Sequence, residues 1–149
     1  MVRLRSIEGL EQLRSDILSS RDSTKPLVAI CAGTGCLTLG ARLVVRAFQE
    51  YLIKKGLEKE IEIKETGCPG FCEKGTLVVV YPRGVYYIGV QPGDVPEIVE
   101  ETILKGNLVN RLLYNDPETG ENAVTESDIP FYKHQMRHLI KDNIKINPK

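Results

Sequence analysis

The sequence lacks the features that mark nucleic-acid-binding and membrane-spanning proteins. Among its 149 residues, twenty basic side chains balance twenty acidic ones, so the net charge is zero. A neutral chain lacks the basic surface that nucleic-acid binding normally requires, so we expect no nucleic-acid partner. No apolar run approaches the length of a membrane span, so we expect no membrane insertion. The 42% hydrophobic and 27% charged residues are instead typical of a soluble globular protein with one core.

The chain also lacks a signal-peptide core and is poor in cysteine. Residues 1–16, MVRLRSIEGLEQLRSD, are charged and periodic. We therefore expect a cytoplasmic protein, whose thiols stay reduced unless they bind a metal. The only four cysteines form two close pairs. In a reducing compartment, that arrangement points to a metal site or to redox chemistry.

Hydrophobic periodicity predicts the order helix, strand, helix, strand, strand, strand, helix. The predicted helices cover 6–20, 38–56 and 94–106, and the strands cover 26–31, 60–66, 76–82 and 85–90. The first strand–helix–strand unit should be parallel with a right-handed crossover. The last two strands should form an antiparallel hairpin with a helix over the sheet. This α/β arrangement resembles thioredoxin: a four-stranded mixed sheet flanked by helices, here with an added N-terminal helix.

Local signals define the ends of these helices. Ser6 should cap the first helix, and Gly56 and Gly106 should end the other two. Asp94 and Glu97 have the spacing of a capping box. The second helix should face the core with one apolar stripe, which comprises Ala41, Val44, Val45, Phe48 and Leu52.

The character of the chain changes after Gly106. Residues 107–128 are polar, and residues 129–143 return to weak helix periodicity, capped by Ser127 or Asp128. We therefore predict one domain over 1–106 and an extended tail with a short helix over 107–149, because the tail is too short for a core of its own. Its apolar residues could cover the domain's core, but we favour docking on a partner subunit. These residues are Ile129, Phe131, Tyr132, Met136, Leu139 and Ile140.

The cysteines follow two strands that we expect to be neighbours. Cys31 and Cys36 flank CAGTGC after the first strand, and Cys68 and Cys72 lie in TGCPGFCEKG after the second. Loops that leave parallel strands emerge at the same sheet edge, where α/β folds usually hold ligands. The four thiols should therefore converge in space.

Small residues around the cysteines favour an inorganic cluster. Glycines let the backbone approach a bulky cluster and present N–H donors to its sulfides. A helix that begins near Thr38 should also point its positive end toward the site. Pro69 and Phe71 could shield one side from water, or simply pack in the loop. The glycines concerned are Gly33, Gly35, Gly67, Gly70 and Gly75.

Four alternatives to a cluster could also account for the cysteines. A disulfide scaffold is unfavourable in a reducing compartment. Structural zinc suits four thiolates, although zinc knuckles mostly use tighter local pairs. A thioredoxin-type dithiol catalyst needs C-x-x-C, whereas four residues separate Cys31 from Cys36. Four unrelated buried cysteines would fit poorly in glycine-flanked loops.

The cysteine spacing resembles that of the thioredoxin-like [2Fe–2S] ferredoxins, with C-x4-C after the first strand and C-x3-C after the second. In that family all four cysteines are ligands, two to each iron. The resemblance implies a [2Fe–2S] cluster in which Cys31 and Cys36 hold one iron and Cys68 and Cys72 the other. By analogy with plant-type clusters, its reduction potential should be roughly −300 to −400 mV.

Residues 6–148 also resemble the N-terminal region of the flavin- and NADH-binding (beta) subunit of cytoplasmic [FeFe]-hydrogenases and related bifurcating complexes. The stretches that carry this likeness include CAGTGC, ILKGNLVNRLLY and IPFYKHQMRHLI. In that family this module precedes an FMN/NADH domain. This chain stops at KINPK without a glycine-rich FMN or NADH loop, so we carry neither function over and expect a free-standing small subunit rather than a module cut from a longer chain.

The resemblance implies a one-electron carrier in a multisubunit NAD(P)H-linked oxidoreductase, without a catalytic site of its own. The implied partners are a flavoprotein NAD(P)H-binding subunit and other iron–sulfur subunits, and related ferredoxins can pair as homodimers. One rival is a zinc-binding interaction module without redox activity. Another is a thiol oxidoreductase that forms a reversible Cys31–Cys36 disulfide.

Two further pairs of residues give weak indications of a functional role. His134 and His138 lie four residues apart on the predicted tail helix and could bind a metal, but no third ligand is in sight, so a solvated or partner-facing surface is the expectation. Glu73 and Lys74 follow Cys72 and could orient a redox partner, although a solvated loop is commoner.

Overall fold

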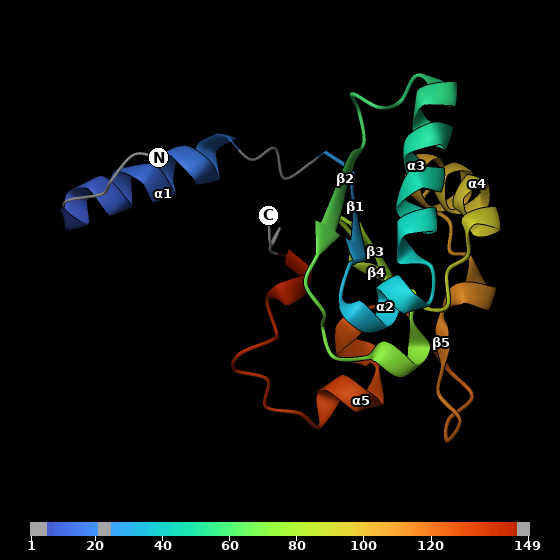
Figure 1. The fold of residues 1–149 in the computed structure, drawn as a ribbon. Helices are drawn as coiled ribbons and strands as arrows, with labels where there is room; N and C mark the ends of the chain where they lie inside the picture. Colours follow the sequence, from blue (N-terminus) through green and yellow to red (C-terminus); the bar gives the residue numbers. More distant parts are fainter. Residues whose placement is uncertain (1–5, 21–24, 146–149) are drawn as a thin grey trace.

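A mixed four-stranded sheet forms the centre of the protein. The computed structural model describes residues 6–20 and 25–145. The first residues of the predicted domain (1–106) and the last residues of the predicted tail (107–149) therefore lie outside the described residues. The strand order is β2-β1-β3-β4, in which β1 runs parallel to β2 and antiparallel to β3, and β3 and β4 form an antiparallel hairpin (Figure 1). The strands are β1 (Leu27–Cys31), β2 (Glu62–Thr66), β3 (Val78–Tyr81) and β4 (Val85–Tyr87). The predicted thioredoxin-like sheet is confirmed.

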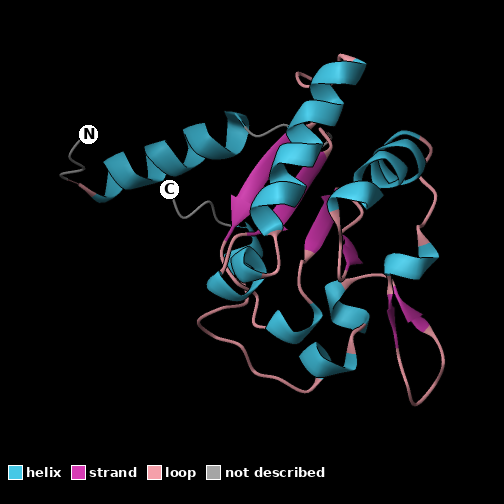
Figure 2. Cartoon of the chain, turned by 45° about the vertical axis from the view of Figure 1, so that its right-hand side comes forward, coloured by secondary structure: helices cyan, strands magenta, loops and turns pink. Residues whose placement is uncertain are grey.

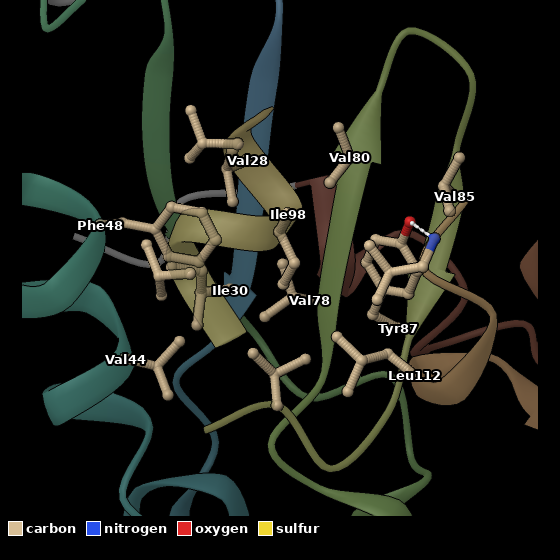
Figure 3. Close-up of a cluster of buried hydrophobic side chains, with 14 of the residues drawn as sticks. Val28, Ile30, Val44, Phe48, Val78, Val80, Val85, Tyr87, Ile98 and Leu112 are labelled. Carbon is tan, nitrogen blue, oxygen red and sulfur yellow. Dashed lines mark hydrogen bonds between the residues drawn. The ribbon is translucent and has the colours of Figure 1, made fainter. Parts of the chain in front are cut away.

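The main core lies between one face of the sheet and two helical segments. These are α3 (Ala41–Lys55) and the continuous run of α4 (Val95–Glu97) and the π-helical η3 (Ile98–Leu104). All five residues of the stripe predicted for the second helix are buried. Figure 3 shows Val44 and Phe48 of α3 facing Ile30 of the sheet. This burial of branched and aromatic side chains, each contributing about 1.5–3 kcal/mol, anchors β1 and so fixes the position where it ends.

Three of the predicted helix ends are confirmed by the structure. The backbone N–H of Gly9 donates to Ser6 Oγ over 3.1 Å, so Ser6 caps α1 (Ile7–Ser20) as predicted. Gly56 and Gly106 have positive φ angles of 70° and 75° and end their helices, because glycine adopts the left-handed conformation without a Cβ penalty.

One predicted helix start and one predicted capping box differ from the structure, whereas Asp94 does precede α4 as predicted. The predicted helix over 38–56 is two helices, α2 (Thr34–Thr38) and α3, separated at Gly40, whose φ of 97° breaks the run. The predicted Asp94–Glu97 capping box lies three residues earlier. Gln91 and Asp94 cap each other's backbone at the 3-10 turn η2 (Pro92–Asp94) that leads into α4.

Residues after Gly106 pack against the sheet, in contrast to the tail that we predicted. The turn η4 (Asn110–Leu112) and the residues beside it belong to the main core. Leu113 bridges to Tyr87, and Thr125 bridges to Val85, so the chain pairs with the free edge of β4. A short hairpin of β5 (Tyr114–Asn115) and β6 (Asn122–Ala123) lies between these bridges. Gly106 is therefore not a boundary between separately packed units.

The last described residues cover the second face of the sheet. Ile129, Tyr132 and Ile144 are buried there, in one apolar cluster with residues of β1, β3 and β4. The predicted docking of Ile129 and Tyr132 on a partner is therefore wrong, because the domain's own sheet buries them. Met136 and Leu139 remain 84% and 93% exposed, so partner docking stays a prediction for them.

A short helix is present in the tail as predicted, but it does not extend over 129–143. Only α5 (Pro130–Lys133) is helical, between the 3-10 turns η5 (Glu126–Asp128) and η6 (Asn143–Lys145). Asp128 contributes to a capping box with Thr125 at η5 rather than capping the predicted helix. His134 and His138 therefore do not share a helix, and the geometric reason for treating them as a pair is absent.

Helix α1 stands apart from the rest of the described fold. It extends away from the sheet in both Figure 1 and Figure 2, and the apolar side chains Ile7, Leu10, Leu13 and Ile17 are exposed. Across residues 6–20 and 25–145, none of the helices has the length and apolar character needed to cross a membrane.

Candidate functional site

The structure brings all four cysteines to one edge of the sheet. Cys31 is the last residue of β1, Cys36 lies in α2, Cys68 follows β2, and Cys72 begins the 3-10 turn η1 (Cys72–Lys74). Figure 1 shows α2 and the turn after β2 together beyond the carboxyl ends of β1 and β2. The predicted convergence is therefore confirmed, and it follows from the parallel β1–α3–β2 unit.

The thiols form two close pairs. The Sγ atoms of Cys68 and Cys72 lie 3.4 Å apart, and the thiols of Cys31 and Cys36 are hydrogen-bonded. Within the described residues, no three histidine, cysteine or acidic side chains gather around one point as ligands of a single metal ion do. Two pairs of thiolates match a cluster with two irons, each of which takes two sulfur ligands from the protein.

Three of the predicted glycines leave the space beside these thiols open. A Cβ on Gly33 would lie 2.7 Å from the Cβ of Cys68 and 3.5 Å from the Sγ of Cys31. A Cβ on Gly35 would lie 3.2 Å from the Sγ of Cys72, and one on Gly75 would lie 2.9 Å from the Sγ of Cys36. Any larger residue would enter the space between the pairs, so these glycines form a cradle that fits a compact inorganic group.

Backbone N–H groups are directed at the sulfurs. The N–H of Gly70 donates to the Sγ of Cys68 over 3.3 Å. The backbone of Gly33 hydrogen-bonds the thiol of Cys31, and the backbone of Leu77 hydrogen-bonds that of Cys36. Such donors stabilise negative charge on sulfur and therefore tune the potential of a cluster.

The hydrogen bond between the inner thiols shifts their pKa values in opposite directions. The hydrogen bond from Cys31 lowers the pKa of Cys36 to about 7, and the same hydrogen bond, together with burial, raises the pKa of Cys31. The hydrogen bond with Cys68, followed by burial, raises the pKa of Cys72. Iron would deprotonate all four thiols, since a thiol that coordinates a metal binds as the thiolate.

The two pairs differ in their access to solvent. Cys31 and Cys36 are 0% exposed, whereas Cys68 is half-buried and Cys72 is exposed. A two-iron cluster held by these residues would have one iron inside the domain and the other at its surface. Because only the Cys68–Cys72 side is near solvent, a partner could approach the site from that side.

The helix that we predicted from Thr38 begins three residues later, because α3 starts at Ala41 and the five-residue α2 lies between it and Gly33. The contribution of its dipole to the site stays a prediction. Individual N–H donors also direct positive character at the sulfurs.

Phe71 and Pro69 contact the C-terminal part of the chain. The ring of Phe71 is buried, stacks on Phe131 with 4.6 Å between centroids, and meets Tyr132 edge-on at 5.6 Å. The carbonyl of Pro69 accepts a hydrogen bond from Arg137 over 3.2 Å. Ordinary loop packing, one of the two interpretations of Pro69 and Phe71, is therefore correct. The segment against which they pack lies about sixty residues further along the same chain.

Sequence reasoning missed Arg137 and Asn143. The side-chain amide of Asn143 donates to the carbonyl of Cys68 over 3.1 Å. Arg137 lies within IPFYKHQMRHLI and Asn143 just after it, but nothing in the order of residues there indicates contact with a loop about seventy residues earlier. Glu73 and Lys74, in contrast, pair with each other beside Cys72 and face solvent, as expected for a solvated loop.

Comparison with known proteins agrees with this site. No family model matches the sequence. The "Ferredoxin, 2Fe-2S" of Clostridium pasteurianum is 43% identical over 77 residues, which cover 52% of this chain and 76% of the relative. That of Aquifex aeolicus is 43% identical over 79 residues, covering 52% of this chain and 71% of the relative. The crystal structure of the wild-type thioredoxin-like [2Fe–2S] ferredoxin from Aquifex aeolicus superposes with a TM-score of 0.56 at 36% identity, covering 61% of this chain and 97% of that chain.

Fold, thiol pairs and glycine cradle together define an iron–sulfur electron carrier. Both relatives are 43% identical to this chain, and the matched residues cover 76% and 71% of their lengths. This similarity establishes the family. The chain belongs to the thioredoxin-like [2Fe–2S] ferredoxins, and its cofactor is a [2Fe–2S] cluster. The cluster accepts and releases one electron at a time, while the protein fixes its position and sets its potential. The zinc module and the dithiol catalyst are accordingly set aside.

Proposed function

We propose that the chain transfers single electrons between its cluster and a flavoprotein that oxidises or reduces NAD(P)H. Cys31 and Cys36 would hold one iron of the cluster, and Cys68 and Cys72 the other. The chain would act in the cytoplasm as a small subunit of a multisubunit oxidoreductase of the bifurcating hydrogenase type. The sequence likeness over residues 6–148 is the reason for choosing this class of complex.

Exposed apolar side chains beside the cysteine loops carry this proposal. Leu39 is 49% exposed, and its Cδ1 would lie 3.0 Å from a Cβ on Gly75. Ile140 is partly exposed and lies beside Gly70, and the half-exposed Phe131 stacks on Phe71. Met136 and Leu139 are 84% and 93% exposed, and they are the sequence neighbours of Arg137 and Ile140, which contact Pro69 and Gly70. Apolar surface of this kind marks interaction sites, and here it lies next to the exposed cysteine pair.

A partner bound at this apolar surface would meet the cluster on its exposed side. Electron transfer needs close approach, and Cys72 is the cysteine nearest to solvent. Docking would also remove water from Met136 and Leu139, whose exposure is otherwise unfavourable. The same surface would therefore provide both binding energy and the electron path.

The test uses the tagged full chain, purified anaerobically from the organism that encodes it. We expect a flavin-containing partner to copurify, and NADH or NADPH to reduce the cluster in that complex, as measured by its S = 1/2 EPR signal. The double variant Met136→Asp, Leu139→Asp should lower the rate of NAD(P)H-driven reduction at least roughly tenfold, since charged groups at an interface core are strongly unfavourable.

The control is Leu104→Asp, because Leu104 is 50% exposed on η3 rather than beside the cysteine loops. Dithionite should reduce the cluster equally in all variants. Equal NAD(P)H-driven rates in the double variant and the control would contradict docking at this apolar surface, and the absence of any NAD(P)H-driven reduction would contradict the proposed partner.

Pairing of two copies remains a separate proposal from the same resemblance. It predicts a mass of twice 16.7 kDa in light scattering of the purified protein. A single-chain mass at micromolar concentration would contradict it.

A further inference from the structure

The segment 126–145, which we call the strap, lies against the loop that carries Cys68. This loop, Gly67–Phe71, leaves β2 and has no regular secondary structure. The strap begins at η5, passes through α5, and returns to lie against β1 and β2 at η6. Besides the ring contacts of Phe71, the strap makes hydrogen bonds to the loop backbone before and after Cys68.

Asn143 forms hydrogen bonds with the backbone before and after the side chain of Cys68. Its side-chain amide donates to the carbonyl of Cys68 over 3.1 Å, and its own carbonyl accepts from the N–H of Gly67 over 3.1 Å. Asn143 thus binds the two peptide groups that flank the Gly67–Cys68 peptide, and this restricts how the backbone can rotate. The two hydrogen bonds therefore fix the direction in which the Cys68 side chain leaves the loop.

Arg137 holds the next peptide group along the loop. Its Nη1 donates to the carbonyl of Pro69 over 3.2 Å, while its Nη2 pairs with Glu126 over 2.5 Å. The guanidinium also lies over the ring of Tyr132, 4.0 Å from the centroid, and the side chain is only 14% exposed. A planar fork that is fixed by a carboxylate and an aromatic ring is well suited to orient a third partner.

The third group that Arg137 binds is the carbonyl of Pro69. It belongs to the peptide group whose N–H donates to the sulfur of Cys68. The carbonyl of Pro69 and the N–H of Gly70 belong to the same planar peptide unit, and this N–H donates to the Sγ of Cys68 over 3.3 Å. Arg137 therefore orients the donor from its opposite end. A hydrogen bond from a cation to the carbonyl also polarises the peptide and strengthens its N–H as a donor.

Two glycines that we assigned to the cluster make room for the strap. A Cβ on Gly67 would lie 3.1 Å from the Cβ of Asn143, and one on Gly70 would lie 3.0 Å from the Cδ1 of Ile140. Gly70 also has a φ of 101°, which other residues rarely adopt. Gly70 thus serves both neighbours, because its N–H faces sulfur while its Cα faces the strap.

We propose that Arg137 and Asn143 are positioning residues for the cluster, which act by orienting the Pro69–Gly70 peptide and the Cys68 side chain. The proposal rests on ligation of iron by Cys68. A donor to a ligand sulfur stabilises the more negative, reduced cluster and so raises its potential. Loss of the strap contacts should therefore make the potential more negative and let the cluster dissociate faster.

The experiment compares Arg137→Gln and Arg137→Lys with Arg111→Gln on the purified, cluster-loaded full chain. Arg111 also bridges two acidic residues, Asp94 of η2 and Glu97 of α4, rather than any group of the cysteine loops. For Arg137→Gln we expect a more negative midpoint potential in an EPR-monitored titration, and release of iron to a chelator roughly tenfold faster. Arg137→Lys should restore part of both, and Arg111→Gln should change neither.

A second variant, Asn143→Ala, covers the case in which Arg137→Gln folds poorly. It keeps the backbone carbonyl that binds Gly67 and removes only the amide, so faster iron release with an unchanged thermal unfolding curve is expected. The proposal is overturned if Arg137→Gln and Asn143→Ala keep the wild-type potential and release rate, or if Arg111→Gln shifts them equally. Iron retained in full by Cys68→Ala would overturn the ligand assignment itself, and is measured separately by metal analysis.

Discussion

The inner and outer cysteine pairs are held by different parts of the chain. Cys31 and Cys36 lie at the end of a central strand and within a short helix, and both are completely buried. Cys68 and Cys72 lie in an irregular loop and an exposed turn. The inner pair is placed by the sheet, whereas the outer pair depends on side chains that arrive from residues 126–145.

This difference separates two requirements of an electron carrier. The cluster must stay bound, which favours ligands fixed in a rigid core. It must also be reached by a partner, which requires ligands near the surface. A loop that is held by the strap provides exposure without the freedom that an irregular loop would otherwise have. The following predictions test this division, from the largest expected effect to the smallest.

Removal of an inner ligand should abolish the cluster, and removal of an outer ligand should weaken it. In Cys36→Ala no solvent can reach the vacant iron position, because the site is buried. In Cys72→Ala the exposed position remains open to water or hydroxide as a replacement. We expect about two irons and two sulfides per chain in the wild type, almost none in Cys36→Ala and an intermediate amount in Cys72→Ala. Equal losses in both would contradict the division.

Gly33→Ala should push the two pairs apart. The new Cβ would meet Cys68 at 2.7 Å, and φ at this position is −65°, so the effect is steric rather than conformational. Overpacking of this kind costs about 1–3 kcal/mol, and it should lower cluster content and thermal stability. Gly93→Ala is the control, because a Cβ there meets nothing within 4 Å. Normal cluster loading in Gly33→Ala would show that the cradle is not needed.

Phe71→Leu should loosen the outer pair and leave the inner pair in place. The change removes the ring contacts with Phe131 and Tyr132, which contribute about 1 kcal/mol. We expect faster iron release with a modest decrease in the unfolding temperature. The matched control, Phe48→Leu, lies in the main core and should lower stability without changing the release rate of the folded protein. The same release rate in both variants would contradict a special role for the outer loop.

Asp128→Asn should have the smallest effect and should depend on pH. Hydrogen bonds from the hydroxyl and backbone N–H of Thr125 lower the pKa of the Asp128 carboxyl. A lowered folded-state pKa contributes stability above the unfolded value, and this stability is lost as the pH falls through the folded value. For the cluster-free protein we expect a loss of about 0.5 kcal/mol at pH 7, because the group is exposed, and no difference in strong acid. A difference that persists in acid would exclude the carboxylate as the cause.

The sequence predicted the parts of the site that are local or periodic. The run Leu27–Cys31 and the five-residue stripe of α3 required a parallel strand–helix–strand unit, and that unit brings the two cysteine loops to one edge. The glycines of CAGTGC also had a steric reason to be there. What periodicity could not predict is the break at Gly40, because either side of it has the same apolar pattern.

Only the tertiary structure decided how the C-terminal third is used. Residues 107–128 have the pattern of a polar tail, and the apolar residues that follow them are only weakly periodic. Their burial depends on pairing with the free edge of β4 and on the second face of the sheet, which no local window contains.

The sequence by itself therefore determined the fold class, the four convergent thiols and the inner half of the site. The hydrophobic period and the strand–loop order are local properties, and they are sufficient for that. The tertiary structure decided the outer half, since Arg137 and Asn143 reach Cys68 and Pro69 across about seventy residues of chain. Contacts between such distant side chains are set by packing of the whole domain, and no local pattern encodes them.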